Sequence, residues 1–163
     1  MNVHIRRAVP ADTRAMAALL NPIIAAGGTT AISESVQAET LAEWMANDGA
    51  RGAWHLAEDD TGALLGFQWI GPRNGLPEDA CDVATFVRME QTGPGIGSRL
   101  FEATKAAARA LGYTWINAAI RADNAGGLAY YQSRGFEDWK REENVALANG
   151  QRVDRIFKRY DLR

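Results

Sequence analysis

Apolar and polar residues alternate at the start of the chain and then take up a helical spacing. The alternation over Val3 to Ala8 predicts a β-strand, and the Pro10-Ala11-Asp12 segment after it is typical of a helix start. The apolar residues that follow recur at three- and four-residue intervals: Met16, Leu19, Leu20, Ile23 and Ile24. Pro22 interrupts this pattern. Because its ring removes a hydrogen bond and clashes with the preceding turn, we expect a kink or break near Leu20 to Asn21.

The middle of the chain predicts a second helix and then a hairpin. Gln37 to Ala46 carries apolar side chains at helical spacing, whereas Ala53 to Glu58 and Ala63 to Ile70 are typical of strands. The segment from Asp59 to Gly62 between these strands has the composition of a tight turn. This part of the chain should therefore form a helix followed by two antiparallel strands.

Strands and helices alternate in the second half of the chain. The expected elements, in order, are a strand from Asp82 to Met89, a helix from Ile96 to about Leu111, a strand from Thr114 to Ile120, a helix from Asn124 to Arg134, and two strands, Phe136 to Lys140 and Val153 to Asp161. We see no internal repeat, low-complexity tract or linker in the sequence. The predicted order is thus a strand, helices, a meander, then strand, helix, strand and helix, and two closing strands.

Composition excludes several classes of protein. A chain of 163 residues is one domain's worth, so we expect a single domain over residues 1–163. The formal net charge of −2, without a basic block, argues against a nucleic-acid partner. Cys81 is the only cysteine, which excludes an internal disulfide, and His4 and His55 add no zinc cluster of usual spacing. Without a signal-like start or an apolar run of membrane-spanning length, we expect a cytoplasmic protein with no membrane partner.

The strongest chemical signal is the glycine-rich turn from Gln91 to Leu100, which joins a predicted strand to a predicted helix. Glycines let the backbone approach an oxyanion, and the unpaired N–H groups of the first helical turn point at it. A P-loop is excluded because no Lys precedes Arg99. A dinucleotide site is disfavoured because Ser98 stands at the third glycine and no acid ends the next strand before Asp123. A tight turn without a ligand is the remaining alternative.

A third phosphate-binding design, the coenzyme A pyrophosphate loop of the GNAT superfamily of N-acetyltransferases, resembles this turn. Its motif is Arg or Gln, two residues, Gly, one residue, then Gly or Ala, and Gly95-Ile96-Gly97 matches the glycines. Thr92 stands where the family has Arg or Gln. The segment from Asn124 to Glu137 resembles the family's second signature, an Asn and a short helix ending in Tyr-x-x-x-Gly-Phe, with Tyr131 on the family's tyrosine. Taken singly, each residue has a purely structural alternative. Asn124 could be no more than a helix cap, and Tyr131 could be no more than a core aromatic.

The resemblance covers essentially the whole chain. It implies the GNAT fold, an α/β mixed sheet of about seven strands with a splayed central parallel pair and four helices, and acetyl-CoA as co-substrate without a metal. The residues that it assigns to the coenzyme are Phe86, Val87, Met89, Thr92, Gly93, Gly95, Ile96, Gly97, Ser98, Asn124 and Tyr131. Because Thr92 lacks the reach of Arg or Gln, the backbone amides from Gly93 to Ser98 are expected to hold the pyrophosphate, with ordinary rather than tight affinity.

The resemblance also implies two catalytic residues. Tyr131 is expected to stabilise the leaving thiolate by a hydrogen bond, with the proton following, since the ordinary pKa of tyrosine lies above that of a thiol. Tyr130, about 100° further round the helix, is expected to pack outward. Asp82 aligns with the glutamate that phosphinothricin-type members carry near the start of this strand and is the predicted base. A merely solvated acid at the strand end is the alternative for Asp82.

The acceptor is expected to be a small amine. Asn21 to Ile24, the Gly71-Pro72 loop and Asn149 to Asp154 resemble the phosphinothricin-type members, which acetylate small amino-acid-like amines. Tyr131, where those members often have His, is a departure. Arg73 could bind a substrate carboxylate. A peptide or protein N-acetyltransferase and a non-catalytic coenzyme-binding module stay as alternatives, and a homodimer is possible.

Overall fold

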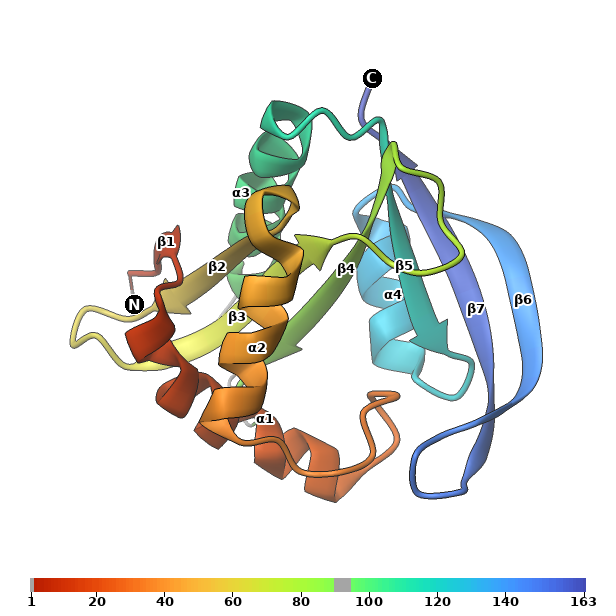
Figure 1. Ribbon diagram of the computed structural model, residues 1–163, viewed down its shortest axis with the longest axis horizontal. Helices are drawn as coiled ribbons and strands as arrows, with labels where there is room; N and C mark the ends of the chain where they lie inside the picture. The colour runs from red at the N-terminus through yellow and green to blue at the C-terminus, as the bar shows by residue number, and fades with distance from the viewer. Residues whose placement is uncertain (1, 90–94) are drawn as a thin grey trace.

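The computed structural model describes residues 2–89 and 95–163, which form one seven-stranded sheet and four α-helices (Figure 1). The strands are β1 (His4–Arg7), β2 (Ala53–Glu58), β3 (Leu64–Gly71), β4 (Ala80–Val87), β5 (Trp115–Arg121), β6 (Glu137–Ala146) and β7 (Arg152–Asp161). The helices are α1 (Thr13–Ala26), α2 (Ala38–Asp48), α3 (Ile96–Ala110) and α4 (Ala125–Ser133), with short 3-10 turns at Pro10–Asp12 and Gly49–Arg51. The strand order is β1-β2-β3-β4-β5-β7-β6. The expected mixed α/β fold is confirmed.

The central pair of strands, β4 and β5, is parallel and diverges along its length. Only Ala80, Cys81 and Asp82 of β4 pair with β5, and Asp82 faces Asn117 at the last paired position. Beyond it β4 continues to Val87 along β3, while β5 continues to Arg121 along β7. The expected splay of the parallel pair is therefore present. It opens the middle of the sheet at the carboxyl ends of both strands, where α/β folds commonly bind ligands.

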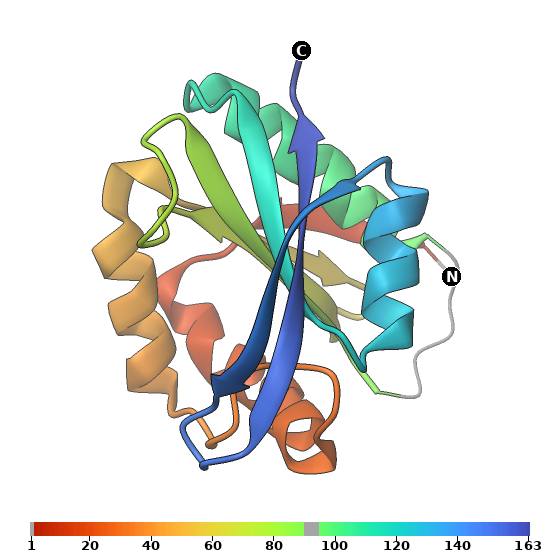
Figure 2. The same ribbon diagram turned by 90° about the vertical axis from the view of Figure 1, so that its right-hand side faces the viewer.

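Helices cover both faces of the sheet (Figures 1 and 2). One core cluster joins α1 and α2 to Trp54, Phe67 and Phe86, and another joins α3 and α4 to Val83 and Ile116. Because side chains alternate along a strand, β4 turns Val83 toward α3 and α4 and turns its neighbours toward α1 and α2. Each diverging strand thus offers side chains to both sides of the gap.

Helix α1 runs through Pro22, so a break near Leu20 to Asn21, one of the two outcomes expected there, does not occur. The apolar side chains before and after the proline are buried in one cluster, and this packing outweighs the lost hydrogen bond. Asn21 adds a tertiary tie, since its side-chain amide donates to the Val36 carbonyl at 2.9 Å and accepts from the Val36 N–H at 2.8 Å. The segment between α1 and α2 is thereby held against α1.

Two strand boundaries also differ from the prediction. β6 extends to Ala146 rather than Lys140, because an exposed edge strand does not need the alternation by which strands are recognised in a sequence. β4 begins at Ala80 and ends at Val87, so Met89 lies beyond it and is 46% exposed. No helix in the described ranges has the length and apolar character needed to cross a bilayer.

Candidate active site

A pocket of about 640 Å³ lies where β4 and β5 diverge. Its lining draws on β4 from Asp82 to Val87, on the end of β5, on the start of α4 and on the loop from Thr29 to Ile32. Tyr131 belongs to the core cluster of α3 and α4, whereas Phe86 belongs to that of α1 and α2. The pocket therefore has walls on both faces of the sheet and can take one ligand from each side.

The first turn of α3 borders the pocket on the α3/α4 side. Gly95 turns the chain into the helix with a φ of 89°, a left-handed conformation that favours glycine. The first backbone bond of the helix is donated by Arg99 to Gly95 at 2.9 Å, so the amides of Ile96, Gly97 and Ser98 have no acceptor within the helix. Such a turn suits an anion. Thr92 and Gly93, also predicted to hold it, lie outside the described residues.

Gly97 is required because Tyr130 packs directly on it. A Cβ at Gly97 would meet the Tyr130 ring carbon Cε1 at 2.6 Å. The Tyr130 hydroxyl donates to the Gly97 carbonyl at 2.8 Å. The expectation that Tyr130 packs outward is therefore wrong. Since Gly97 has no side chain, the ring of Tyr130 can lie against α3, and Tyr130 lines the pocket. Burial raises the pKa of the Tyr130 hydroxyl.

Tyr131 is 7% exposed and lies on the same side of the sheet. Its hydroxyl oxygen is 2.8 Å from Oγ1 of Thr85 on β4. Burial raises the pKa of Tyr131 far above that of an ordinary tyrosine. The side chain therefore stays protonated and acts as a hydrogen-bond donor rather than as a base.

Asn124 begins α4 and also lines the pocket. Its side-chain oxygen accepts from the Gly127 N–H at 2.9 Å, which is the capping role that its residue type favours. Its side-chain nitrogen donates to the Thr29 carbonyl at 2.9 Å. Asn124 thus fixes the start of α4 against the loop between α1 and α2.

Asp82 lies at the point where β4 and β5 part, on the α1/α2 side. Its carboxylate accepts from Asn117 Nδ2 at 2.8 Å and from Arg73 at 3.2 Å. Burial raises the pKa of Asp82 above its ordinary value, and the positive charge of Arg73 acts in the opposite direction. Arg73, predicted to hold a substrate carboxylate, is thus engaged with Asp82, and its guanidinium lies 5.3 Å from the centre of the Phe157 ring.

Gln68, Thr85 and Arg134 also lie at this site and were not singled out from the sequence. Gln68 is fully buried in β3, where its amide nitrogen lies 2.7 Å from Thr85 Oγ1. A lone glutamine inside the apolar run from Leu64 to Ile70 is the signal that could have found it. Arg134 at the end of α4 contacts the hydroxyl of Ser98 and brings a positive charge to the first turn of α3.

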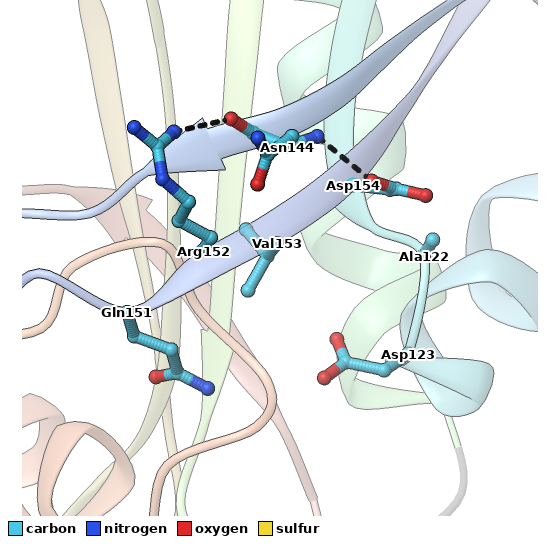
Figure 3. Close-up of a pocket in the computed structure, with 7 residues that line it drawn as sticks. All are labelled: Ala122, Asp123, Asn144, Gln151, Arg152, Val153 and Asp154. Atoms are coloured by element: carbon cyan, nitrogen blue, oxygen red, sulfur yellow. Dashed lines mark hydrogen bonds between the residues drawn. The ribbon is translucent and has the colours of Figure 1, made fainter.

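A second hollow, of about 450 Å³, lies between the β6–β7 hairpin and the end of β5 (Figure 3). Several of its polar groups already have partners. Asp154 accepts from the Asn144 N–H at 2.9 Å, and Arg152 donates to the Asn144 carbonyl at 2.7 Å. Asp123 is paired with Arg121 at 2.9 Å. This hollow offers less unpaired chemistry than the gap between β4 and β5.

The described ranges show neither a ready cysteine nucleophile nor a cluster of metal ligands. Cys81 is fully buried, and burial raises the pKa of its thiol to about 12, so it is not a ready thiolate. In those ranges no three His, Cys, Asp or Glu side chains gather as a metal site would need.

A splayed parallel pair, an anion-binding helix start on one face and a carboxylate on the other are the features of an N-acetyltransferase fold and site. The chain belongs to the acetyltransferase (GNAT) family, whose model matches residues 24–136. It is therefore an acetyltransferase by family.

Individual relatives resemble the chain over nearly its whole length. It is 30% identical to an L-methionine sulfoximine/L-methionine sulfone acetyltransferase of Pseudomonas aeruginosa, over 99% of this chain and 96% of that protein. The structure of a ribosomal-protein-alanine N-acetyltransferase from Brucella melitensis matches with a TM-score of 0.86 and 25% identity, over 97% of this chain and 99% of that one. A GNAT superfamily phosphinothricin acetyltransferase from Sinorhizobium meliloti, solved with AcCoA, shares the fold with a TM-score of 0.87 at 21% identity, over 99% and 89% of the two chains.

Proposed function

We propose that this enzyme transfers an acetyl group from acetyl-CoA to the primary amine of a small, amino-acid-like substrate, by direct attack in a ternary complex. The observation that carries the proposal is the pocket with walls on both faces of the sheet. The coenzyme enters from the α3/α4 side and the amine from the α1/α2 side. The two reactants then meet in the gap between β4 and β5 without a covalent enzyme intermediate.

On the coenzyme side, backbone amides bind the pyrophosphate. Those of Gly95 to Ser98 begin α3, and Gly93 and Thr92 precede them. Backbone groups of Phe86, Val87 and Met89 would bind the pantetheine arm as an added strand beside β4. Arg134 compensates for Thr92, because its guanidinium lies next to Ser98 and adds the positive charge that a threonine lacks.

In the transfer step the amine nitrogen forms a bond to the acetyl carbon while the carbon–sulfur bond breaks. Hydrogen bonds from the backbone along Val87 polarise the thioester carbonyl. Tyr131 donates a hydrogen bond to the leaving sulfur, which takes up a proton as free coenzyme A. Asp82 accepts the proton that the ammonium substrate must lose, directly or through water, and its raised pKa makes it a better base than an exposed aspartate.

The acceptor side suits an amino acid better than a peptide. Asp82 and Arg73 form an ion pair at 3.2 Å, and an amino-acid substrate would exchange with it, its amine facing Asp82 and its carboxylate facing Arg73. The relative at 30% identity is named for L-methionine sulfoximine and L-methionine sulfone. A peptide acceptor is the second candidate, since one structural neighbour is a ribosomal-protein-alanine N-acetyltransferase. We place the enzyme in the cytoplasm.

A substrate panel tests the proposal. Release of free thiol from acetyl-CoA would be measured with amino acids and their sulfoximine and sulfone analogues, with polyamines and with peptides of varied N-terminal residue. We expect saturable thiol release with a small amino-acid-like amine and a matching N-acetyl product. A preference for peptides would favour the second candidate. Binding of acetyl-CoA without any acetylated product would indicate a non-catalytic module.

The Asp82→Asn variant tests whether Asp82 is the base, and its Tm shows whether the variant is still folded. Because folding buries the carboxylate and raises its pKa, the ionised form is less favourable in the folded protein than in the unfolded chain. We therefore expect Asp82→Asn to lower kcat/KM for the amine by roughly 10²-fold without lowering the Tm at pH 8. An undiminished rate across pH would remove Asp82 from the mechanism.

A further inference from the structure

A chain of hydrogen bonds crosses the α3/α4 side of the pocket from α3 to Tyr131. It begins at the Gly97 carbonyl, which accepts from the Tyr130 hydroxyl at 2.8 Å. Gln68 Nε2 donates to that hydroxyl at 3.2 Å and to Thr85 Oγ1 at 2.7 Å. Thr85 Oγ1 in turn lies 2.8 Å from the Tyr131 hydroxyl. Gln68, at the centre of this chain, is fully buried.

The direction of the chain follows from counting protons. A carbonyl can only accept, so the proton of Tyr130 is committed to Gly97. The Tyr130 oxygen can then only accept from Gln68, which turns the amide nitrogen rather than the amide oxygen toward both hydroxyls. An amide nitrogen carries two protons, and its second proton goes to Thr85.

The consequence reaches Tyr131. Thr85 Oγ1 accepts from Gln68, and the Tyr131 oxygen 2.8 Å away is the one acceptor for the Thr85 proton among the described residues, so donating to Tyr131 leaves no proton of Thr85 unpaired. The proton of Tyr131 then has no acceptor among the described residues, and Tyr131 lines the pocket. The opposite amide orientation would draw the Thr85 proton toward Gln68 and leave Thr85 only an acceptor toward Tyr131. The orientation of Gln68 thus biases whether the Tyr131 proton points to Thr85 or into the pocket.

We propose that Gln68 is a positioning residue that fixes the direction of this chain, through Thr85, so that the proton of Tyr131 faces the leaving sulfur of the coenzyme. This inference rests on the proposed acetyl transfer. It also connects the coenzyme-binding turn to the leaving-group donor, because the chain starts at Gly97 in the first turn of α3. Gln68 and Thr85 themselves touch neither reacting atom.

The pKa of the coenzyme A thiol in its complex with the enzyme reports on this proton without any amine substrate. A thiol that accepts a hydrogen bond as thiolate ionises at lower pH than the free thiol, whose pKa is about 8.5. The thiolate can be titrated by its ultraviolet absorbance. The only cysteine of the chain, Cys81, stays silent below its pKa of about 12.

The test is a double-mutant cycle of Gln68→Glu with Thr85→Val. A carboxylate can only accept, so Gln68→Glu should reverse the chain and raise the pKa of the bound thiol by about one unit, a tenfold change. In the Thr85→Val background the chain is cut, and Gln68→Glu should add little. An equal shift in both backgrounds would mean that the new charge acts through space and would overturn the proposal. So would the absence of any shift.

A neutral variant covers the case in which a buried carboxylate prevents folding. Gln68→Met has a similar volume and removes the donor without adding charge. We expect it to lower kcat while the KM for acetyl-CoA changes little, and to raise the pKa of the bound thiol by less than Gln68→Glu does. Unchanged kcat and unchanged thiol pKa would contradict the role of Gln68. If the wild type binds coenzyme A but acetylates no amine, the proposed function fails, and the thiol titration still decides the direction of the chain.

Discussion

At the scale of single residues, two adjacent tyrosines of α4 differ in where their protons go. Tyr130 donates to the Gly97 carbonyl in the first turn of α3, whereas the Tyr131 hydroxyl lies 2.8 Å from Thr85 and, in the proposed direction of the chain, keeps its proton free to face the pocket. Both side chains are protonated at neutral pH, as tyrosines ordinarily are, and burial raises both pKa values further. Only Tyr131 therefore combines a raised pKa with an available proton. The pair gives matched variants for the leaving-group role.

We predict different kinetic effects for the two tyrosine variants. Tyr131→Phe removes the donor to the leaving sulfur, so kcat should fall by roughly 10²-fold while the KM for acetyl-CoA changes little. Tyr130→Phe removes both the tie to α3 and the acceptor that orients Gln68, so it should raise the KM for acetyl-CoA and lower kcat by less than Tyr131→Phe does. Steady-state kinetics with a saturating amine would measure both. An unchanged kcat in Tyr131→Phe would exclude that residue as the leaving-group donor.

The sequence indicated some of these residues and missed others for physical reasons. Gly97 and Tyr131 lie in motifs with fixed spacing, and Asp82 opens a recognisable strand. Gln68 gave only a weak signal, because its chemistry depends on Thr85 and Tyr130, whose positions beside it are set by strand register and helix packing. The helical angle predicted an outward Tyr130, but a glycine on a neighbouring helix made room for the ring.

At the scale of elements, α1 shows how packing decides a local conflict. Pro22 lies within the helix, although it cannot donate the bond that its position normally supplies. The buried apolar residues on both sides, and the side chain of Asn21 bonded to Val36, hold the helix through the proline. Ile23 and the loop after α1 line the pocket. The helix that loses a backbone hydrogen bond at Pro22 is thus one that lines the proposed amine side of the pocket.

Pro22→Ala should stabilise the protein. The variant restores a backbone N–H to the helix interior, and the gain exceeds the entropy that proline removes from the unfolded chain. We expect the free energy of unfolding to rise by about 1–2 kcal/mol. Urea denaturation of the variant and the wild type would measure the difference. A less stable variant would indicate that the backbone at Pro22 departs from a geometry that alanine can use.

The elements themselves were largely predictable, and their bounds less so. The helical spacing from Met16 to Ile24 and the alternation of the central strands gave the right element types. β6 was predicted too short because its exposed edge carries mostly polar residues. The splay of β4 from β5 came from the resemblance to a family and not from the residue pattern, since pairing between distant strands leaves no periodic signal in one sequence.

At the scale of the whole molecule, acid should destabilise the fold through His55. Its ring is 7% exposed on β2, Nδ1 has no hydrogen-bond partner among the described residues, and burial lowers its pKa from 6.5 to about 4. The unfolded chain therefore binds a proton more readily than the folded protein between these pH values. The stability that neutral His55 provides is present above pH 6.5 and is lost as the pH falls toward 4.

We expect the free energy of unfolding to fall by about 2 kcal/mol between pH 7.5 and pH 5 because of His55. Urea denaturation at the two pH values would measure the change, and His55→Gln, which cannot titrate, should flatten the dependence. His4, which is exposed, offers a control, and His4→Gln should retain the dependence. An equal pH dependence in the wild type and His55→Gln would assign the effect to other groups.

The central claim is that coenzyme and amine occupy opposite sides of one gap in the sheet and react directly. Two-substrate initial-rate kinetics test it most directly, with acetyl-CoA varied at several fixed concentrations of the best small amine. Because both reactants must be bound together, we expect double-reciprocal lines that intersect to the left of the vertical axis, with one N-acetylated product for each thiol released. Parallel lines would show that an acetylated enzyme forms before the amine binds. Thiol release that does not depend on the amine would contradict acetyl transfer itself.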